Sequence, residues 1–177
     1  MISRMVFQCY PVEEVSAVRQ AFGLQVSPES VPTRPSQTEA GSLGIALNHG
    51  VIKNQLAEIG RMQGYIGEEE YPLESTRLDV VWRRVERSVP TYVFEVQIGG
   101  DIYHAVAKLK HAFDLWNSHI FLVASMAQKS RLEELLSGTF HEVASQMLFI
   151  EASFVKQLLD KKKDYKEMER VLGIFKR

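Results

Sequence analysis

The chain has 177 residues, of which 45% are hydrophobic and 24% are charged, and its formal net charge is −1. This composition predicts a globular chain with one sizeable core, and it excludes a global basic field, so that any polyanion site must come from a local cluster. The single cysteine, Cys9, excludes an internal disulfide and a multi-cysteine zinc site. No apolar run reaches membrane-spanning length and no signal-peptide pattern opens the chain. We therefore expect a soluble, cytoplasmic protein.

The first 44 residues are predicted to form a small N-terminal appendage with a linker. Residues 1–10 are compatible with a strand, and residues 11–22 begin with a proline and continue with apolar side chains at helical spacing. From residue 27 to residue 44 the composition changes to serine, proline, threonine and glycine, which is typical of a linker or long loop. The main domain is therefore expected to cover residues 45–177.

The main domain is predicted to contain both helices and strands. Residues 45–62 show helical spacing up to Gly64, and residues 65–73 form a weak strand with an acidic run. Two β-rich runs flank a short polar segment that ends at Pro90, which predicts an antiparallel hairpin of residues 78–82 and 91–98. The later pattern predicts a helix at residues 101–116, a buried strand at 120–124, a helix at 128–136, a strand at 146–150 and a terminal helix at 152–175.

Each strand of the predicted hairpin carries one carboxylate inside an apolar run, Asp79 in the first strand and Glu95 in the second. A buried acid costs free energy unless a partner or a metal compensates its charge. Antiparallel pairing would bring the two acids close together, and the alternation of strand side chains puts Gln97 on the same face as Glu95. The hairpin therefore predicts a patch with two acids and one amide.

The segments Arg77-Leu78-Asp79-Val80-Val81 and Phe94-Glu95-Val96-Gln97 resemble the two active-site strands of the restriction-endonuclease-like PD-(D/E)xK nucleases. The order of helix, three strands, helix and strand over about residues 47–150 is similar to the core of that family. The resemblance implies an α/β fold with a restriction-endonuclease-like core, in which helices flank a central mixed sheet of four to five strands. It also implies a divalent-metal-dependent DNA endonuclease of restriction, repair or recombination type.

The resemblance implies a Mg²⁺ or Mn²⁺ site whose ligands are Asp79, Glu95 and the backbone carbonyl of Val96. Hard oxygen ligands suit Mg²⁺, and a bound divalent cation polarises a phosphodiester and activates water. The family's motif lysine is replaced here by Gln97, which implies that an amide orients the attacking water by hydrogen bonds.

Three further residues are candidates for this site. Lys108 or His104, on the helix after the hairpin, would compensate for the missing motif lysine. Glu58, on the first helix of the main domain, is a candidate third metal ligand, because Lys53 and Asn54 stand where the related junction resolvases carry a glutamate.

Positive charge is clustered locally, which predicts where a nucleic-acid backbone binds. His104 is also a candidate for nucleic-acid binding, whereas His49, His119 and His141 lack ligand-like spacing and are interpreted as surface or hydrogen-bonded histidines. The arginines expected to flank the active-site strands and bind phosphates are Arg77, Arg83, Arg84 and Arg87.

Three interpretations remain open from the sequence. The chain is a Mg²⁺-dependent DNA nuclease, or a catalytically degenerate module of the same fold that binds nucleic acid or assembles with partners. The third alternative is that Asp79 and Glu95 are structural acids paired with Arg77 and Arg83 in an unrelated α/β domain. Homodimers are also expected, with the apolar terminal helix as their interface.

Overall fold

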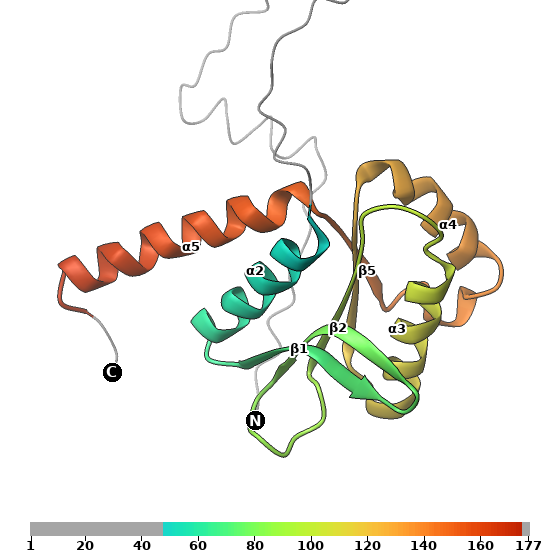
Figure 1. Cartoon of the computed structure of the whole chain (residues 1–177), viewed down its shortest axis with the longest axis horizontal. Coiled ribbons are helices and arrows are strands. Elements are labelled where there is room, and N and C mark those ends of the chain that lie inside the picture. Colours follow the sequence, from blue (N-terminus) through green and yellow to red (C-terminus); the bar gives the residue numbers. More distant parts are fainter. Residues whose placement is uncertain (1–47, 175–177) are drawn as a thin grey trace, which may run out of the picture. The chain divides into compact units, whose positions relative to one another are not determined.

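The computed structural model describes residues 48–174 (Figure 1). The predicted appendage and linker of residues 1–44, with Cys9, lie outside the described residues. The described chain is an α/β unit in which helices flank a five-stranded mixed sheet, as the sequence predicted. Its elements are α2 (His49–Met62), β1 (Ile66–Leu73), β2 (Thr76–Arg83), β3 (Tyr92–Gln97), α3 (Tyr103–Trp116), β4 (His119–Ala124), the 3₁₀ turn Met126–Gln128, α4 (Lys129–Ser137), the 3₁₀ turn His141–Val143, β5 (Met147–Glu151) and α5 (Ser153–Val171).

The five strands lie in the sheet in the order in which they follow in the chain. β1 pairs with β2 and β2 with β3 in antiparallel orientation, which confirms the predicted hairpin. β4 and β5 are parallel to β3. Parallel neighbours need a crossover connection, and α3 and α4 supply the two crossovers. The carboxyl ends of β3, β4 and β5 therefore lie at the same edge of the sheet.

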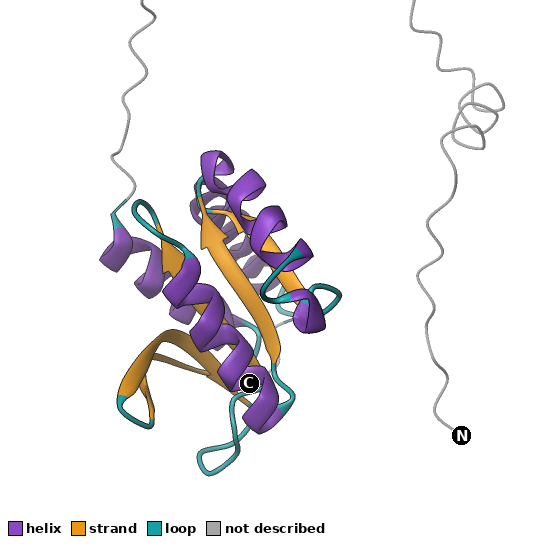
Figure 2. Cartoon of the chain, turned by 90° about the vertical axis from the view of Figure 1, so that its right-hand side faces the viewer, coloured by secondary structure: helices purple, strands orange, loops and turns teal. Residues whose placement is uncertain are grey.

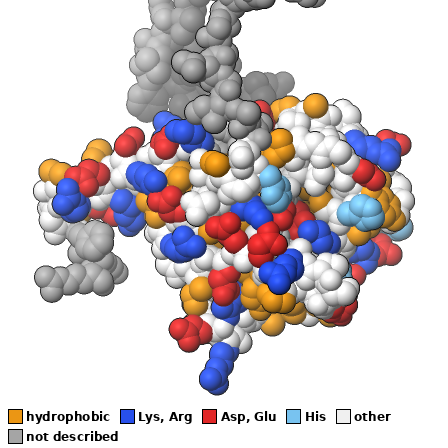
Figure 3. All heavy atoms as spheres, viewed as in Figure 1, with side chains coloured by type: hydrophobic (Ala, Val, Ile, Leu, Met, Phe, Trp, Pro, Cys, Tyr) orange, Lys and Arg blue, Asp and Glu red, His pale blue; other side chains and the backbone are white. Residues whose placement is uncertain are grey.

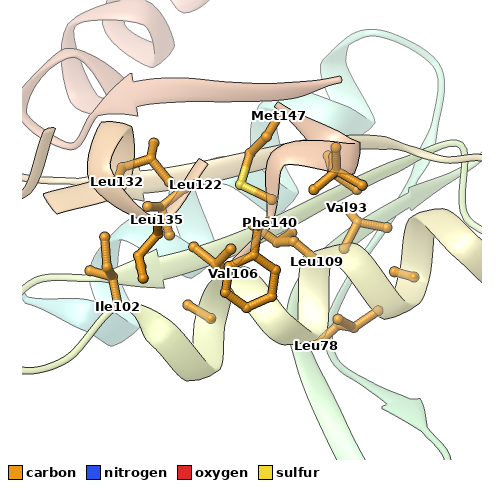
Figure 4. Packing of buried hydrophobic residues seen from close by; sticks show 14 of the residues in the cluster. Leu78, Val93, Ile102, Val106, Leu109, Leu122, Leu132, Leu135, Phe140 and Met147 are labelled. Atoms are coloured by element: carbon orange, nitrogen blue, oxygen red, sulfur yellow. The ribbon is translucent and has the colours of Figure 1, made fainter. Parts of the chain in front are cut away.

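Helices cover both faces of the sheet and create two hydrophobic cores (Figure 2). On one face α3 and α4 pack against the sheet; Figure 4 shows side chains such as Val106, Leu109 and Phe140 in this core. On the other face α2 and α5 pack against the sheet, with Leu56 and Val155 among the buried residues. Each helix has one apolar side and can cover only one face of the sheet. Both faces of the sheet are apolar, so each is covered by its own pair of helices.

α2 lies very close to the antiparallel part of the sheet. The indole Nε1–H of Trp82 donates a hydrogen bond to the carbonyl oxygen of Leu56 over 2.9 Å. A Cβ at Gly67 would collide with the backbone carbonyl of Ala57, and a Cβ at Gly60 would collide with the Trp82 ring. Glycine is therefore needed on both elements, and this close contact fixes the distance of α2 from β2.

The helix ends differ from the predicted ends by a few residues. α2 begins after Asn48, whose side chain accepts a hydrogen bond from the Val51 N–H over 3.2 Å. α3 begins two residues later than predicted, because Asp101 accepts from the Tyr103 N–H at 3.0 Å while Ile102 is the capping residue. α5 ends at Val171, before the predicted residue 175, and Gly173 just beyond its C-cap has a positive φ of 69°. None of the helices in residues 48–174 combines the length and apolar character needed to cross a membrane.

Candidate functional site

Asp79 and Glu95 lie side by side at the point where β2 and β3 separate. The ladder between these strands ends with the pair Val80 and Phe94. Beyond it, the Asp79 N–H donates to Oε1 of Glu95 over 3.0 Å, and the Val96 N–H donates to Oδ2 of Asp79 over 2.8 Å. The two carboxylates therefore accept hydrogen bonds that a continued ladder would have given to main-chain carbonyls.

The strands are irregular at this position. Leu78 packs in the core under α3, whereas Val80, two residues further, packs in the core under α2. Regular alternation would put both side chains on one face, so the phase of β2 changes at Asp79. The register of β1 leaves Glu70 opposite Asp79, and Glu70 has a left-handed backbone with φ of 53°. Such a conformation is uncommon for residues other than glycine and often accompanies functional sites.

Glu95 is buried under α3, with 2% of its surface exposed. Its Oε2 forms an ion pair with the ammonium of Lys108, which also donates to the Arg77 carbonyl over 3.0 Å. Burial, and next the negative charge of Asp79, raise the pKa of Glu95 to about 7, although Lys108 opposes this shift. A carboxyl group whose pKa is near 7 is partly protonated at neutral pH, and such shifts are common at functional sites.

Asp79 is approached from α2, on the other face of the sheet. Nε2 of His49 lies 3.2 Å from Oδ2 of Asp79, and Nζ of Lys53 lies 4.0 Å from Oδ1. Lys53 is only 8% exposed and forms an ion pair with Glu70. Burial alone would lower the pKa of Lys53, but the hydrogen bond and charge of Glu70, with the charge of Asp79, raise it above the usual value. Lys53 therefore stays an ammonium next to Asp79.

The site thus consists of acidic residues that lie next to basic residues. Asp79, Glu95 and Glu70 come from the three antiparallel strands, while Lys53 and Lys108 come from helices on opposite faces. Figure 3 shows acidic, basic and histidine side chains next to one another near the middle of this face of the molecule.

Gln97 follows the predicted alternation but does not face the acids with a free amide. Phe94 and Val96 pack under α2, so Glu95 and Gln97 belong to the opposite face. Nε2 of Gln97 donates to the carbonyl oxygen of Gly99, in the loop that follows β3. One N–H of the amide is used by this bond, and the amide oxygen can accept a hydrogen bond from a water or a ligand.

Glu58 and His104 do not contact the two acids. Glu58 forms an ion pair with Lys163 of α5 over 2.9 Å. It lies five residues after Lys53, which places it on a different side of α2 because an α-helix has about 3.6 residues per turn. His104 is exposed in the first turn of α3, edge-on to the ring of Tyr103.

The four arginines of the hairpin are divided between its two ends. Arg77 is exposed and precedes Asp79 by two residues, so it lies beside the site. Arg83 pairs with Glu68, and Arg84 and Arg87 are exposed in the loop beyond β2. At about 3.3 Å per strand residue, this loop begins more than about 15 Å from Asp79. Within residues 48–174 the cationic partners of the two acids are Lys53, His49 and Lys108, so the pairing with Arg77 and Arg83 in the third interpretation is wrong.

The sequence interpretation did not select His49, Lys53 or Glu70 for the site. His49 and Lys53 are one turn apart in α2, and their spacing of four residues was the one signal that both face the same way. Nothing local identifies Asp79 as their neighbour, because that contact depends on how α2 packs on the sheet.

The oxygen donors of Asp79 and Glu95 are those that a hard divalent cation prefers. Among the described residues, Oδ1 of Asp79 pairs with Lys53 alone, at 4.0 Å, whereas Oε2 of Glu95 is paired with Lys108. A cation would therefore compete with Lys108 for Glu95. Within residues 48–174, no group of three or more His, Cys, Asp or Glu side chains is arranged to hold a metal ion, so a site here would rest on two carboxylates and a backbone carbonyl.

Comparison of the chain with protein-family models, with curated proteins and with solved structures gives no significant match in any of the three.

Proposed function

We propose that this chain is a divalent-metal-dependent DNA endonuclease with a restriction-endonuclease-like core. The observation that carries the proposal is the junction of β2 and β3, where the Asp79 and Glu95 carboxylates each accept a hydrogen bond from a main-chain N–H of the other strand and Lys108 contacts Glu95. Two converging carboxylates suit a divalent cation, and an adjacent lysine can neutralise charge on a reacting phosphate.

Asp79, Glu95 and the Val96 carbonyl would hold Mg²⁺ or Mn²⁺, which when bound polarises the phosphodiester and lowers the pKa of a bound water. The N–H of Val96 holds the Asp79 carboxylate in one orientation, and the N–H of Asp79 does the same for Glu95. These two hydrogen bonds fix both carboxylates before the substrate binds, so no side-chain entropy is lost during the reaction.

Lys108 takes the role that the motif lysine plays in related nucleases. Its ammonium is held between Glu95 and the Arg77 carbonyl, so it stays close to the reacting phosphate and neutralises part of its charge. The Nε2 group of Gln97 donates to the Gly99 carbonyl, and its amide oxygen would accept a hydrogen bond from the attacking water and orient it.

DNA would be bound mainly through its phosphates. Arg77 lies beside the acids, Arg84 and Arg87 are exposed at the far end of the hairpin, and His104 is exposed on α3. Such contacts supply affinity that is independent of base sequence and weakens with salt. Arg83 contributes less, since Glu68 already neutralises it.

One observation favours a second candidate, a catalytically degenerate module that binds nucleic acid or assembles with partners. Both acids already have cationic neighbours from the chain itself, Lys53 at Asp79 and Lys108 at Glu95. Charge compensation by lysines removes the need for a metal, and the site would then be a rigid, mixed-charge surface.

Calorimetry of Mg²⁺ and Mn²⁺ binding tests the proposal. The Asp79→Ala, Glu95→Ala double variant should lose binding, whereas the matched control Glu86→Ala, Glu133→Ala, which removes two exposed carboxylates elsewhere, should keep it. Cleavage of a mixture of duplex, branched and single-stranded DNA is then assayed with either metal. We expect Asp79→Ala to abolish cleavage while DNA binding stays intact or becomes stronger, because a repelling carboxylate is removed. Absence of metal binding by the unmodified protein, with and without DNA, would leave the second candidate.

A further inference from the structure

A row of exposed side chains runs along α5 at spacings of four and three residues. At about 3.6 residues per turn, this spacing keeps all of them in one narrow stripe, as in a coiled-coil seam. The five apolar or aromatic members are between 47% and 69% exposed. We call this row the α5 stripe; it consists of Phe154, Leu158, Lys161, Tyr165, Met168 and Leu172.

The α5 stripe is not the side of α5 that packs on the protein. Val155 and Leu159 are the buried residues of α5, and they belong to the core under α2. Each of them follows a member of the stripe by one residue, or somewhat more than a quarter of a turn, so the buried side and the exposed apolar stripe are neighbouring but distinct sides of α5. Figure 1 shows that α5 runs alongside α2 and continues past it, away from the sheet. Single exposed apolar residues need no explanation, but a continuous row of them indicates an interaction surface.

We propose that the α5 stripe binds the α5 stripe of a second copy of this chain in antiparallel orientation. When two stripes are placed antiparallel around residue 163, Phe154 faces Leu172 and Leu158 faces Met168. In the same register, the Lys161 ammonium faces the Tyr165 ring, an arrangement that attracts through a cation–π interaction. The stripe is therefore complementary to itself, which a two-fold interface requires.

The charges beside the stripe favour the same orientation. Residues 153–163 contain four lysines and one acid, whereas residues 164–172 contain three acids and two bases. Antiparallel pairing puts the basic half of each helix against the acidic half of the other, and parallel pairing would put like halves together. In the described part of the chain the ion pairs of α5 do not include Lys161, Lys162 or Asp164. Lys162 and Asp164 would face each other across the interface in the register above.

The inference is independent of the proposed function, because no residue of the α5 stripe belongs to the candidate site. Sedimentation of the full chain over a range of concentrations tests it directly. We expect a reversible dimer whose Kd rises at least about tenfold in the Leu158→Glu, Met168→Glu double variant, since both side chains would be buried anchors of the interface. The matched control is Leu115→Glu, Leu148→Glu, which places the same charges at two equally exposed leucines of α3 and β5; its dimer should be unchanged.

Disulfide trapping tests the orientation. In a Cys9→Ser background, Phe154→Cys combined with Leu172→Cys should form a covalent dimer on oxidation, because the two positions face each other in the antiparallel register. Leu158→Cys alone should stay uncrosslinked, whereas a parallel pair would link it to its own copy. A protein that is monomeric at all concentrations, a dimer that the double glutamate variant leaves intact, or cross-linking by Leu158→Cys alone would each overturn the proposal. In the first case the stripe serves another occupant, such as residues 1–47 or a different protein.

Discussion

Lys108 of α3 forms an ion pair with Glu95 of β3 and holds the carbonyl of Arg77 at the same time. If Lys108 replaces the motif lysine, its loss should reduce catalysis far more than the loss of Gln97. We expect Lys108→Met to lower kcat for DNA cleavage at least about 100-fold, a typical contribution of a positioned catalytic group.

Gln97→Ala should lower kcat only a few-fold. The amide nitrogen of Gln97 already donates a hydrogen bond to the Gly99 carbonyl, so the side chain contributes little beyond its oxygen. Lys110→Met, two residues after Lys108 and paired with Asp114, is the matched control and should leave kcat unchanged. An equal loss in the Lys108 and Lys110 variants would show that only the general positive charge of α3 matters. Single-turnover cleavage rates with saturating metal provide the measurement.

The stability of the fold should depend on pH through Glu95. Its pKa of about 7 in the folded chain lies above the value of about 4.3 expected in the unfolded chain. Between these values the folded state binds a proton that the unfolded chain releases, so the free energy of unfolding falls as the pH rises. We expect a loss of about 3 to 4 kcal/mol across this window, with little further change above it.

Glu95→Gln removes this dependence, because an amide does not titrate. Urea unfolding of both proteins measures the difference. The pH is varied from about 4 to about 8, because this range includes the pKa of Glu95 in both the unfolded and the folded chain. Glu133→Gln, at an exposed position of α4, is the control and should behave as the unmodified protein. Identical pH profiles for the unmodified protein and Glu95→Gln would contradict the raised pKa.

Asp79 should stabilise the fold as well as serve the site. Asp79→Ala leaves the buried Val96 N–H without its acceptor, and an unpaired buried donor costs about 1 to 3 kcal/mol. Asp79→Asn keeps an oxygen acceptor, so we expect a smaller loss of stability from it. Both variants should lose cleavage, because neither supplies a charged ligand. Equal destabilisation by alanine and asparagine, measured by urea unfolding, would mean that the hydrogen bond to Val96 contributes little.

The close contact of α2 with β1 should make Gly67 intolerant of any side chain. A Cβ there would collide with the Ala57 carbonyl, a backbone atom that cannot move without shifting α2. We expect Gly67→Ala to destabilise the fold by about 1 to 3 kcal/mol, as overpacking does. Gly99→Ala, where a Cβ would meet nothing within 4 Å, should change stability little. Thermal unfolding compares the two, and equal melting temperatures would show that α2 adapts without cost.

Local patterns in the sequence were sufficient for the elements of the described domain. The alternating runs around Asp79 and Glu95 predicted an antiparallel hairpin, and the structure confirms it. The apolar run before Ser125 predicted a buried strand, which is β4. Helix ends were less accurate, because capping at Asn48 and Ile102 depends on details of one turn. The predicted apolar positions of the terminal helix proved to belong to two sides of α5, since only Val155 and Leu159 are buried.

The sequence by itself determined the type and order of the elements and the proximity of Asp79 to Glu95, because each of these depends on residues close together in the chain. Only the tertiary structure decided that Lys108 meets Glu95 and that Lys53 lies between Asp79 and Glu70. It also decided that Glu58 turns to α5 instead. These contacts depend on the rotation of each helix about its axis and on its distance from the sheet. Packing of the whole core, including Gly67 against Ala57, sets both, and no local pattern encodes them.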